Sequence, residues 1–157
     1  MKNLITNEQV ISLAFGDGEY LSPEVILPSD IALAESKYIV PVVGEELYQE
    51  MLDGSQKSLL DDYVAPALAM AVRTIVQPAL NVRTGQTGLH ISSSMRADTS
   101  TKTAMSMLQR SLVSRRRGLL RRLSDYLKRN ASAFPSYNQG GDALQRCSID
   151  GGYVQIY

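Results

Sequence analysis

The side chains that most often carry catalysis are scarce in this chain of 157 residues. His90 is its single histidine and Cys147 its single cysteine, so the sequence holds no cluster with the spacing of zinc ligands. A nucleophilic Cys–His pair would have to join a glycine-flanked loop to a C-terminal tail, and we do not expect one. Gly16-Asp17-Gly18 lacks the third glycine of a dinucleotide loop, and no Gly-Lys-Ser/Thr phosphate loop occurs. We therefore expect a protein that is not an enzyme and that needs no metal or cofactor.

Charge, in contrast, is distributed very unevenly along the chain. Residues 1–62 hold 12 of the 16 acidic side chains and 3 of the 16 basic ones, a formal charge of −9. Residues 63–157 hold the remaining 4 acidic and 13 basic side chains, a formal charge of +9. Segregated charge of this kind suits docking onto a surface of opposite sign, either another copy of the chain or a polyanion. The distribution favours an assembly protein.

The basic residues concentrate on one predicted helix, which begins at Thr99 or Ser100 and ends near Asn130. One stripe of it is apolar and is interrupted by Arg116; the stripe consists of Met105, Leu108, Leu112, Leu119, Leu120, Leu123 and Leu127. Eight of the 16 basic residues lie within positions 110–129, where Asp125 is the single acid. The candidate contact residues are Arg110, Arg115, Arg117, Arg121, Arg122, Lys128 and Arg129.

Three interpretations of this basic face are open. An exposed helix usually mixes charges of both signs at positions i and i+4, which this helix does not. Its arginines therefore indicate docking onto an acidic protein surface or onto a nucleic-acid backbone, with a merely solvated face as the alternative.

The composition predicts an all-α fold. The chain has no tryptophan and 2 phenylalanines, so its core must be built from aliphatic side chains and methionine, which suits helix-on-helix packing. We expect a small bundle of about five helices over residues 1–133 and an irregular or partner-ordered tail over residues 134–157. The apolar stretch 63–82 is interrupted by charged and polar residues and two prolines, which argues against a membrane span. With no secretion signal either, we expect a soluble intracellular protein.

Start and stop signals place the helices that precede the basic one. Thr6 is a predicted N-cap of a short first helix. A second helix should begin at Ser29 or Asp30 and end at Pro41, because proline lacks a backbone donor. The next should run from Gly44 to Gly54. A central apolar helix should then begin at Ser55 or Ser58, with kinks or a break at Pro66 and Pro78.

Two segments outside these helices are candidates for contact with partners. Residues 84–100 form a predicted Gly/Ser-rich loop in which Leu89, His90 and Ile91 suggest a short strand. The loop is either a hairpin or arm that reaches a neighbouring subunit or a flexible surface connection. Near the C-terminus, residues 149–157 alternate apolar and polar side chains. This pattern predicts either a strand that adds to a sheet edge of another subunit or a disordered end.

The order of these features resembles a known family. The segment YIVPVVGEELY at residues 38–48 precedes a proline-interrupted apolar helix, a Gly/Ser-rich excursion and a long basic helix that closes near FPSY at residues 134–137. Over roughly residues 4–137 the chain resembles the head–tail connector, or neck adaptor, proteins of tailed bacteriophages, especially those of phages and prophages of gut Bacteroidetes.

The resemblance implies a mostly helical subunit without catalytic residues. Such a subunit would form a ring in the virion neck, between the portal and the tail-side proteins, after assembly in the cytoplasm of the bacterial host. DNA would pass through the ring without tight specific binding.

The two faces of a ring contact differ, and the acidic and basic halves of this chain suit such a pair. A channel that bound phosphates tightly would stall DNA. This favours Arg115, Arg117, Arg121 and Arg122 for protein contact. The alternative is a small helical nucleic-acid-binding protein that uses helix 110–129 on phosphates. Only Tyr126 is interleaved with the basic residues for stacking on bases.

Overall fold

The structure is a computed structural model that describes residues 2–16, 21–85, 88–91, 99–145, 147–150 and 153–156. For residues 81–101 and 146–157 the description is limited to the backbone of the helices and strands named below. In the described residues the fold is all-α, as predicted, with two small β-hairpins attached. None of the described helices is long and apolar enough to cross a membrane.

The helical segments join into five continuous helices in the part of the chain that the structure describes. Two short 3-10 turns, η1 (Pro23–Val25) and η5 (Ala131–Ala133), lie outside them. The five helices are α1 (Asn7–Ala14); α2 (Pro28–Ala34) with the π-helical η2 (Glu35–Ile39) and α3 (Val40–Val43); α4 (Glu45–Leu52); α5 (Lys57–Leu59) with the π-helical η3 (Leu60–Val64) and α6 (Ala65–Asn81); and α7 (Thr99–Arg129).

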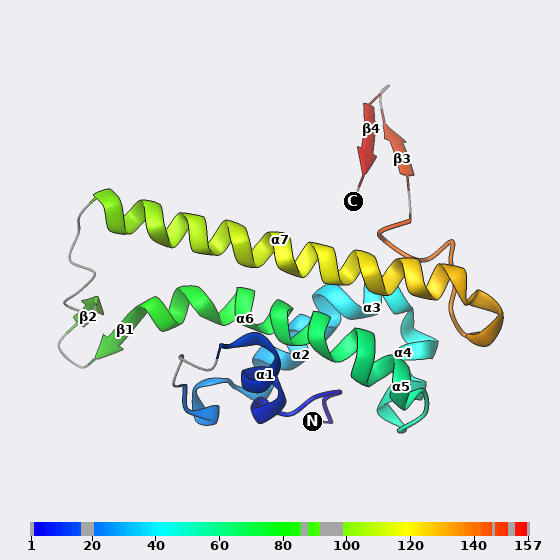
Figure 1. Cartoon of the computed structure of the whole chain (residues 1–157), viewed down its shortest axis with the longest axis horizontal. Coiled ribbons are helices and arrows are strands. Elements are labelled where there is room, and N and C mark those ends of the chain that lie inside the picture. The colour runs from blue at the N-terminus through cyan, green and yellow to red at the C-terminus, as the bar shows by residue number, and fades with distance from the viewer. Residues whose placement is uncertain are drawn as a thin grey trace.

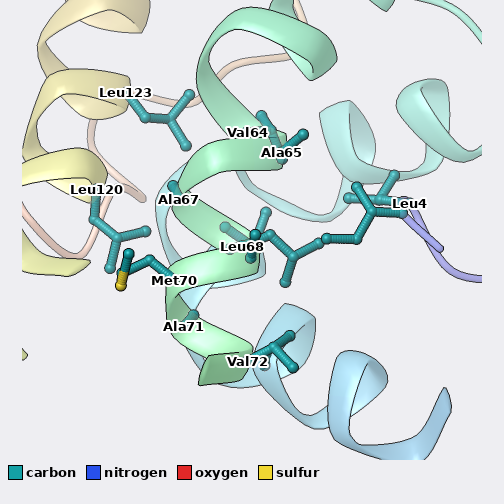
Figure 2. Packing of buried hydrophobic residues seen from close by; sticks show 14 of the residues in the cluster. Leu4, Val64, Ala65, Ala67, Leu68, Met70, Ala71, Val72, Leu120 and Leu123 are labelled. Carbon is teal, nitrogen blue, oxygen red and sulfur yellow. The ribbon is translucent and has the colours of Figure 1, made fainter. Parts of the chain in front are cut away.

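Helix α6 is the central element of the bundle. It packs against α1 and α2 on one side and against α7 on the other (Figure 1). Leu120 and Leu123 of α7 lie against Ala67 and Met70 of α6, while Leu4 approaches α6 from the opposite side (Figure 2). Because α6 is apolar almost all round, it can be buried on both faces at once.

Helix boundaries mostly follow the predicted signals. Thr6 and Gln9 form a capping box at the start of α1, in which each side chain accepts a hydrogen bond from the other's backbone N–H. Gly44 and Gly54 flank α4 with φ angles of 84° and 91°, which favour glycine. The central helix begins at Lys57, after Gln56 with a φ of 57°, and not at Ser55 or Ser58 as predicted.

The prediction that the second helix ends at Pro41 is wrong. The helix continues through Pro41 to Val43, because η2 precedes the proline and Val40 donates its N–H to the carbonyl of Glu35 five residues back. A π turn widens the helix, which makes room for the proline ring and removes the need for its missing donor.

The same arrangement precedes Pro66. Ala65 donates its N–H to the carbonyl of Leu60, again five residues back. Where we predicted a kink or a break at Pro66, the helix continues through a π turn into α6. Pro78, the other predicted site, lies inside α6.

Two antiparallel hairpins extend from the bundle. Strands β1 (Val82–Gly85) and β2 (Gly88–Ile91) pair between α6 and α7, in the segment where a loop or hairpin was expected. Strands β3 (Cys147–Asp150) and β4 (Tyr153–Ile156) pair at the C-terminus and stand away from the bundle on the side of α7 (Figure 1). The remainder of the expected loop, residues 86–87 and 92–98, lies outside the described residues.

Residues 134–145 have an irregular backbone, as predicted, but they pack against their own chain. Phe134 and Tyr137 belong to the hydrophobic core. The buried carboxylate of Asp142 accepts hydrogen bonds from Ser124 Oγ at 2.6 Å, from the Tyr137 hydroxyl at 2.7 Å and from the Leu144 backbone N–H at 2.8 Å. Burial and the bond to Asp142 raise the pKa of Tyr137. The packed domain therefore extends to residue 145, beyond the boundary at 133 expected from the sequence.

Candidate interaction groove on helix α7

The apolar stripe of α7 finds a partner along only part of its length. Leu112, Leu120, Leu123 and Leu127 are buried, and each lies toward α6 or the elements around it. Nearer the N-terminus of the helix, Leu108 is 38% exposed. From Arg110 onward the basic side chains are exposed, except that of Arg116, so this part of α7 presents a charged surface.

Arg116, the basic residue that interrupts the stripe, is explained by the helix that lies opposite. Its guanidinium carbon lies 4.2 Å from the centre of the Tyr38 ring, and its Nη1 donates a hydrogen bond to the Tyr38 hydroxyl at 3.0 Å. Lys37 Nζ lies 5.4 Å from the same ring. Arg116 thereby joins α7 to η2 by a cation–π contact and a hydrogen bond. Its Nε is buried and has no hydrogen-bond partner among the described residues.

Two surface hollows follow one another along α7. One has a volume of about 460 Å³ and the other about 810 Å³, and both are lined by Ser114 and Arg117. Together they run from Ser106 to Arg121, which at 1.5 Å per residue is about 22 Å of helix. We call this feature the α7 groove. Its walls also include Lys37 and Tyr38 of η2 and Leu144 of the tail; along α7 it is lined by Ser106, Gln109, Arg110, Val113, Ser114, Arg116, Arg117, Gly118, Leu120 and Arg121.

The groove is strongly positive. Five cationic side chains line it and no described acidic side chain does; the five are Lys37, Arg110, Arg116, Arg117 and Arg121. Helix α7 as a whole carries nine basic residues and one acid, a formal charge of +8. Within the described part of the chain, no arginine of α7 forms an ion pair with an acidic side chain. This charge is therefore available to an acidic partner.

The seven candidate contact residues divide into two groups. Arg110, Arg117 and Arg121 are exposed and line the α7 groove. Arg115 is exposed but lines neither hollow.

The other three candidate residues contact their own chain. Arg122 lies over the ring of Tyr63, with 4.9 Å from guanidinium carbon to ring centre. Lys128 donates to the side-chain oxygen of Gln145, and Arg129 donates to a backbone carbonyl one turn earlier. Three of the seven predicted residues therefore line the α7 groove, and whether they bind a partner stays a prediction.

The candidate loop residues Leu89, His90 and Ile91 form β2. Their backbone is paired with Thr84, Arg83 and Val82 of β1, respectively. Their side chains lie outside what the structure describes.

Sequence analysis missed the residues that close the groove from outside α7. Lys37, Tyr38 and Leu144 lie far from α7 in sequence, and no local pattern connects them to it. Arg116 did indicate that a residue such as Tyr38 lies opposite, because an arginine within an apolar stripe needs an aromatic or polar partner. Leu144 gave no such signal.

Buried carboxylates elsewhere in the molecule serve the fold. Glu35, in η2, is 2% exposed and accepts hydrogen bonds from the Leu4 backbone N–H at 2.7 Å and from the Tyr48 hydroxyl at 2.9 Å. Burial raises the pKa of Glu35, and the two hydrogen bonds act in the opposite direction. Among the described residues, no three His, Cys, Asp or Glu side chains gather as a metal site would require.

Comparison with known proteins identifies a family. A family model described as a family of unknown function (DUF6712) matches residues 28–145, which include every residue of the α7 groove. No curated protein and no solved structure matches the chain.

Proposed function

We propose that this chain, which belongs to the DUF6712 family of unknown function, is a structural assembly protein. Its role would be that of a head–tail connector subunit, which forms a ring between the portal and the tail of a bacteriophage. The observation that carries the proposal is the charge of α7: nine basic residues and one acid, without an ion pair to the rest of the described chain. The resemblance of residues 4–137 to neck adaptors supplies the biological setting.

Charge balance supports self-association over an unrelated partner. The whole chain has a formal net charge of zero, so the positive charge of α7 is matched by acidic residues elsewhere in the same sequence. Exposed acids such as Glu8 and Glu24 form no ion pair with α7 within the described part of the chain, so they are available to the α7 of another copy. Complementary surfaces of this kind guide association and fix its register.

The proposed setting follows from the same role. The protein would act in the virion neck and, during assembly, in the host cytoplasm. Its partners would be further copies of itself, the portal and the tail-side proteins. DNA would pass through the ring without tight binding, and no catalytic group or cofactor would be needed.

Nucleic-acid binding is the competing function, favoured by a basic groove about 22 Å long. The aromatic residues on and beside α7 argue against it. Tyr126 stacks on Tyr63 with a distance of 4.0 Å between ring centres, and it also packs against Phe134. Tyr38 is covered by Arg116. Neither ring is therefore free to stack on a base, which single-strand binding uses.

Sedimentation and DNA titration together test the proposal. We expect the full chain to self-associate with rising concentration, and we expect added salt to weaken that association, because charged groups make the contact. The double variant Arg117→Glu/Arg121→Glu should lose self-association. Arg115→Glu, on the same helix but outside the groove, is the matched control and should retain it.

The competing function makes the opposite predictions. A chain that stays monomeric at all concentrations, and binds duplex DNA tightly with a steep salt dependence, would be a nucleic-acid-binding protein. Electron microscopy of the associated species provides the final check, since closed rings are expected and open filaments or amorphous aggregates are not.

A further inference from the structure

Large apolar side chains are exposed in two places among the described residues. The first place is the acidic N-terminal part of the chain and the second is one turn of α7. The six residues are Leu13, Val25, Leu27 and Leu33 in the first place, and Met107 and Leu108 in the second. Large exposed apolar side chains are candidates for interaction sites where they lie beside one another on the surface.

The first place combines apolar and negative groups. Residues 3–36 contain six acidic side chains and no basic one. Within this segment Asn7 joins α1 to η1 and the residue that follows it, because its side-chain amide donates to the carbonyls of Pro23 and Ile26. We call this surface the acidic face and define it by Leu13, Val25 and Leu27 with the exposed Glu8 and Glu24.

The second place combines apolar and positive groups. Met107 is 64% exposed, and no side chain between Lys102 and Ser111 is buried. The residues around it include Arg110, at one end of the α7 groove. We call this surface the basic face and define it by Met107 and the α7 groove; Leu108 belongs to the apolar stripe and lies on the other side of the helix from the groove.

The two faces cannot meet within one molecule. Helix α6 lies between α1 on one side and α7 on the other (Figure 1). Contact between the faces therefore requires two copies. Because the faces are different, each copy would keep one face free after pairing, and such head-to-tail contacts close into a ring when the rotation between copies allows it.

We propose that the acidic face of one copy docks on the basic face of the next. This proposal rests on the proposed ring assembly and names its contact surfaces. Apolar side chains from both copies would fill the centre of the contact, with Glu8 and Glu24 of one copy near the arginines of the α7 groove of the other. Apolar residues at the centre and charges around them are the common arrangement of protein interfaces.

A nucleic acid suits the basic face less well. Phosphates would pair with the arginines, but a backbone of phosphate and sugar would leave Met107 uncovered. The acidic face offers negative charge to the arginines and apolar surface to Met107.

Mixing two single variants tests the head-to-tail geometry. Leu27→Asp should disable the acidic face and Met107→Asp the basic face, each weakening self-association by about tenfold or more. A mixture of the two still contains one intact pair of faces, so it should give a 1:1 dimer and nothing larger. Ser132→Asp, exposed on η5, is the control and should assemble normally.

Cysteine cross-linking tests the same contact independently of affinity. In a Cys147→Ser background, the variant with Leu27→Cys and Met107→Cys should give a ladder of disulfide-linked oligomers on oxidation. Each single-cysteine variant should stop at a dimer or remain monomeric. Circular dichroism of each variant checks that it is folded.

The outcomes separate this inference from the proposed function. If both aspartate variants assemble like the wild type and the double-cysteine variant gives no ladder, the named faces are wrong while ring assembly stands. If the wild type itself does not associate, both proposals are wrong.

Discussion

The two ends of α7 carry the same apolar stripe but have different surroundings. Between residues 102 and 111 no side chain is buried, whereas from Leu112 onward the stripe is covered. The covered end packs against α6, η3 and α3, with the tail folded beside it. The comparison teaches that helical periodicity predicts which face is apolar, and that a partner element decides whether this face is buried. The open end is the part of the stripe that the described chain leaves uncovered.

The largest loss of stability is expected from truncating a buried side chain at the covered end of α7. Leu123 is fully buried against α6 (Figure 2), so Leu123→Ala removes contacts and leaves a cavity. The expected loss in the free energy of unfolding is about 2–5 kcal/mol. Urea denaturation followed by far-ultraviolet circular dichroism measures it. A loss below about 1 kcal/mol would mean that this end is packed as loosely as the open end.

A somewhat smaller loss is expected from the tail that folds beside the covered end. Asp142→Ala would leave the Ser124 and Tyr137 hydroxyls and the Leu144 N–H without their acceptor. Because unpaired buried donors are costly, we expect a loss of about 2–4 kcal/mol. Protease digestion of the folded variant should also cleave residues 134–145 faster than in the wild type. Unchanged stability and digestion would show that the tail contributes little to the covered end.

The sequence predicted the elements better than their contacts. The bounds of α7 and the capping box of α1 followed from local signals, because a helix and its cap depend on residues close together in sequence. The predicted helix end at Pro41 was wrong, because the π turn η2, just before the proline, accommodates it. No propensity rule for single residues anticipates a π turn.

The α7 groove shows that the sequence also predicted the candidate functional site only in part. Its basic wall was predicted from the arginines of α7, since their spacing is local. Its other walls come from Lys37 and Tyr38 of η2 and from Leu144 of the tail, which lie far apart in the sequence. Such contacts depend on the packing of the whole chain, which one sequence does not display.

A moderate loss of stability is expected from a change at the contact between Tyr38 and Arg116, where the covered and open ends of α7 meet. Tyr38→Phe keeps the ring under Arg116 but removes the hydroxyl that accepts its hydrogen bond. The expected loss is about 1 kcal/mol in the free energy of unfolding. A double-mutant cycle with Arg116→Met isolates the coupling between the two side chains. A coupling energy of zero would show that Arg116 does not fix α7 against η2.

A smaller effect, dependent on pH, is expected at Glu35, which holds η2 in place. Burial raises its pKa above 4.5 in the folded state, so folding is favoured when the carboxyl is protonated. That contribution is complete below the unfolded pKa and is lost as the pH rises through the raised folded pKa. Glu35→Gln lacks this loss, so its stability relative to the wild type should increase from pH about 4 to about 7. Thermal melts across this range measure the difference, and a flat difference would contradict the prediction.

The smallest effect is expected at the open end, from Leu108→Ala. Leu108 lies on the same stripe as Leu123, but it is 38% exposed, so its truncation creates no cavity. The free energy of unfolding of the monomer should change by less than about 0.5 kcal/mol. Self-association should also change little, since Leu108 lies on the other side of α7 from the groove. Denaturation at a concentration where the chain is monomeric and sedimentation at higher concentration measure the two quantities. A loss of stability near that of Leu123→Ala would show that the monomer itself covers this end of the stripe.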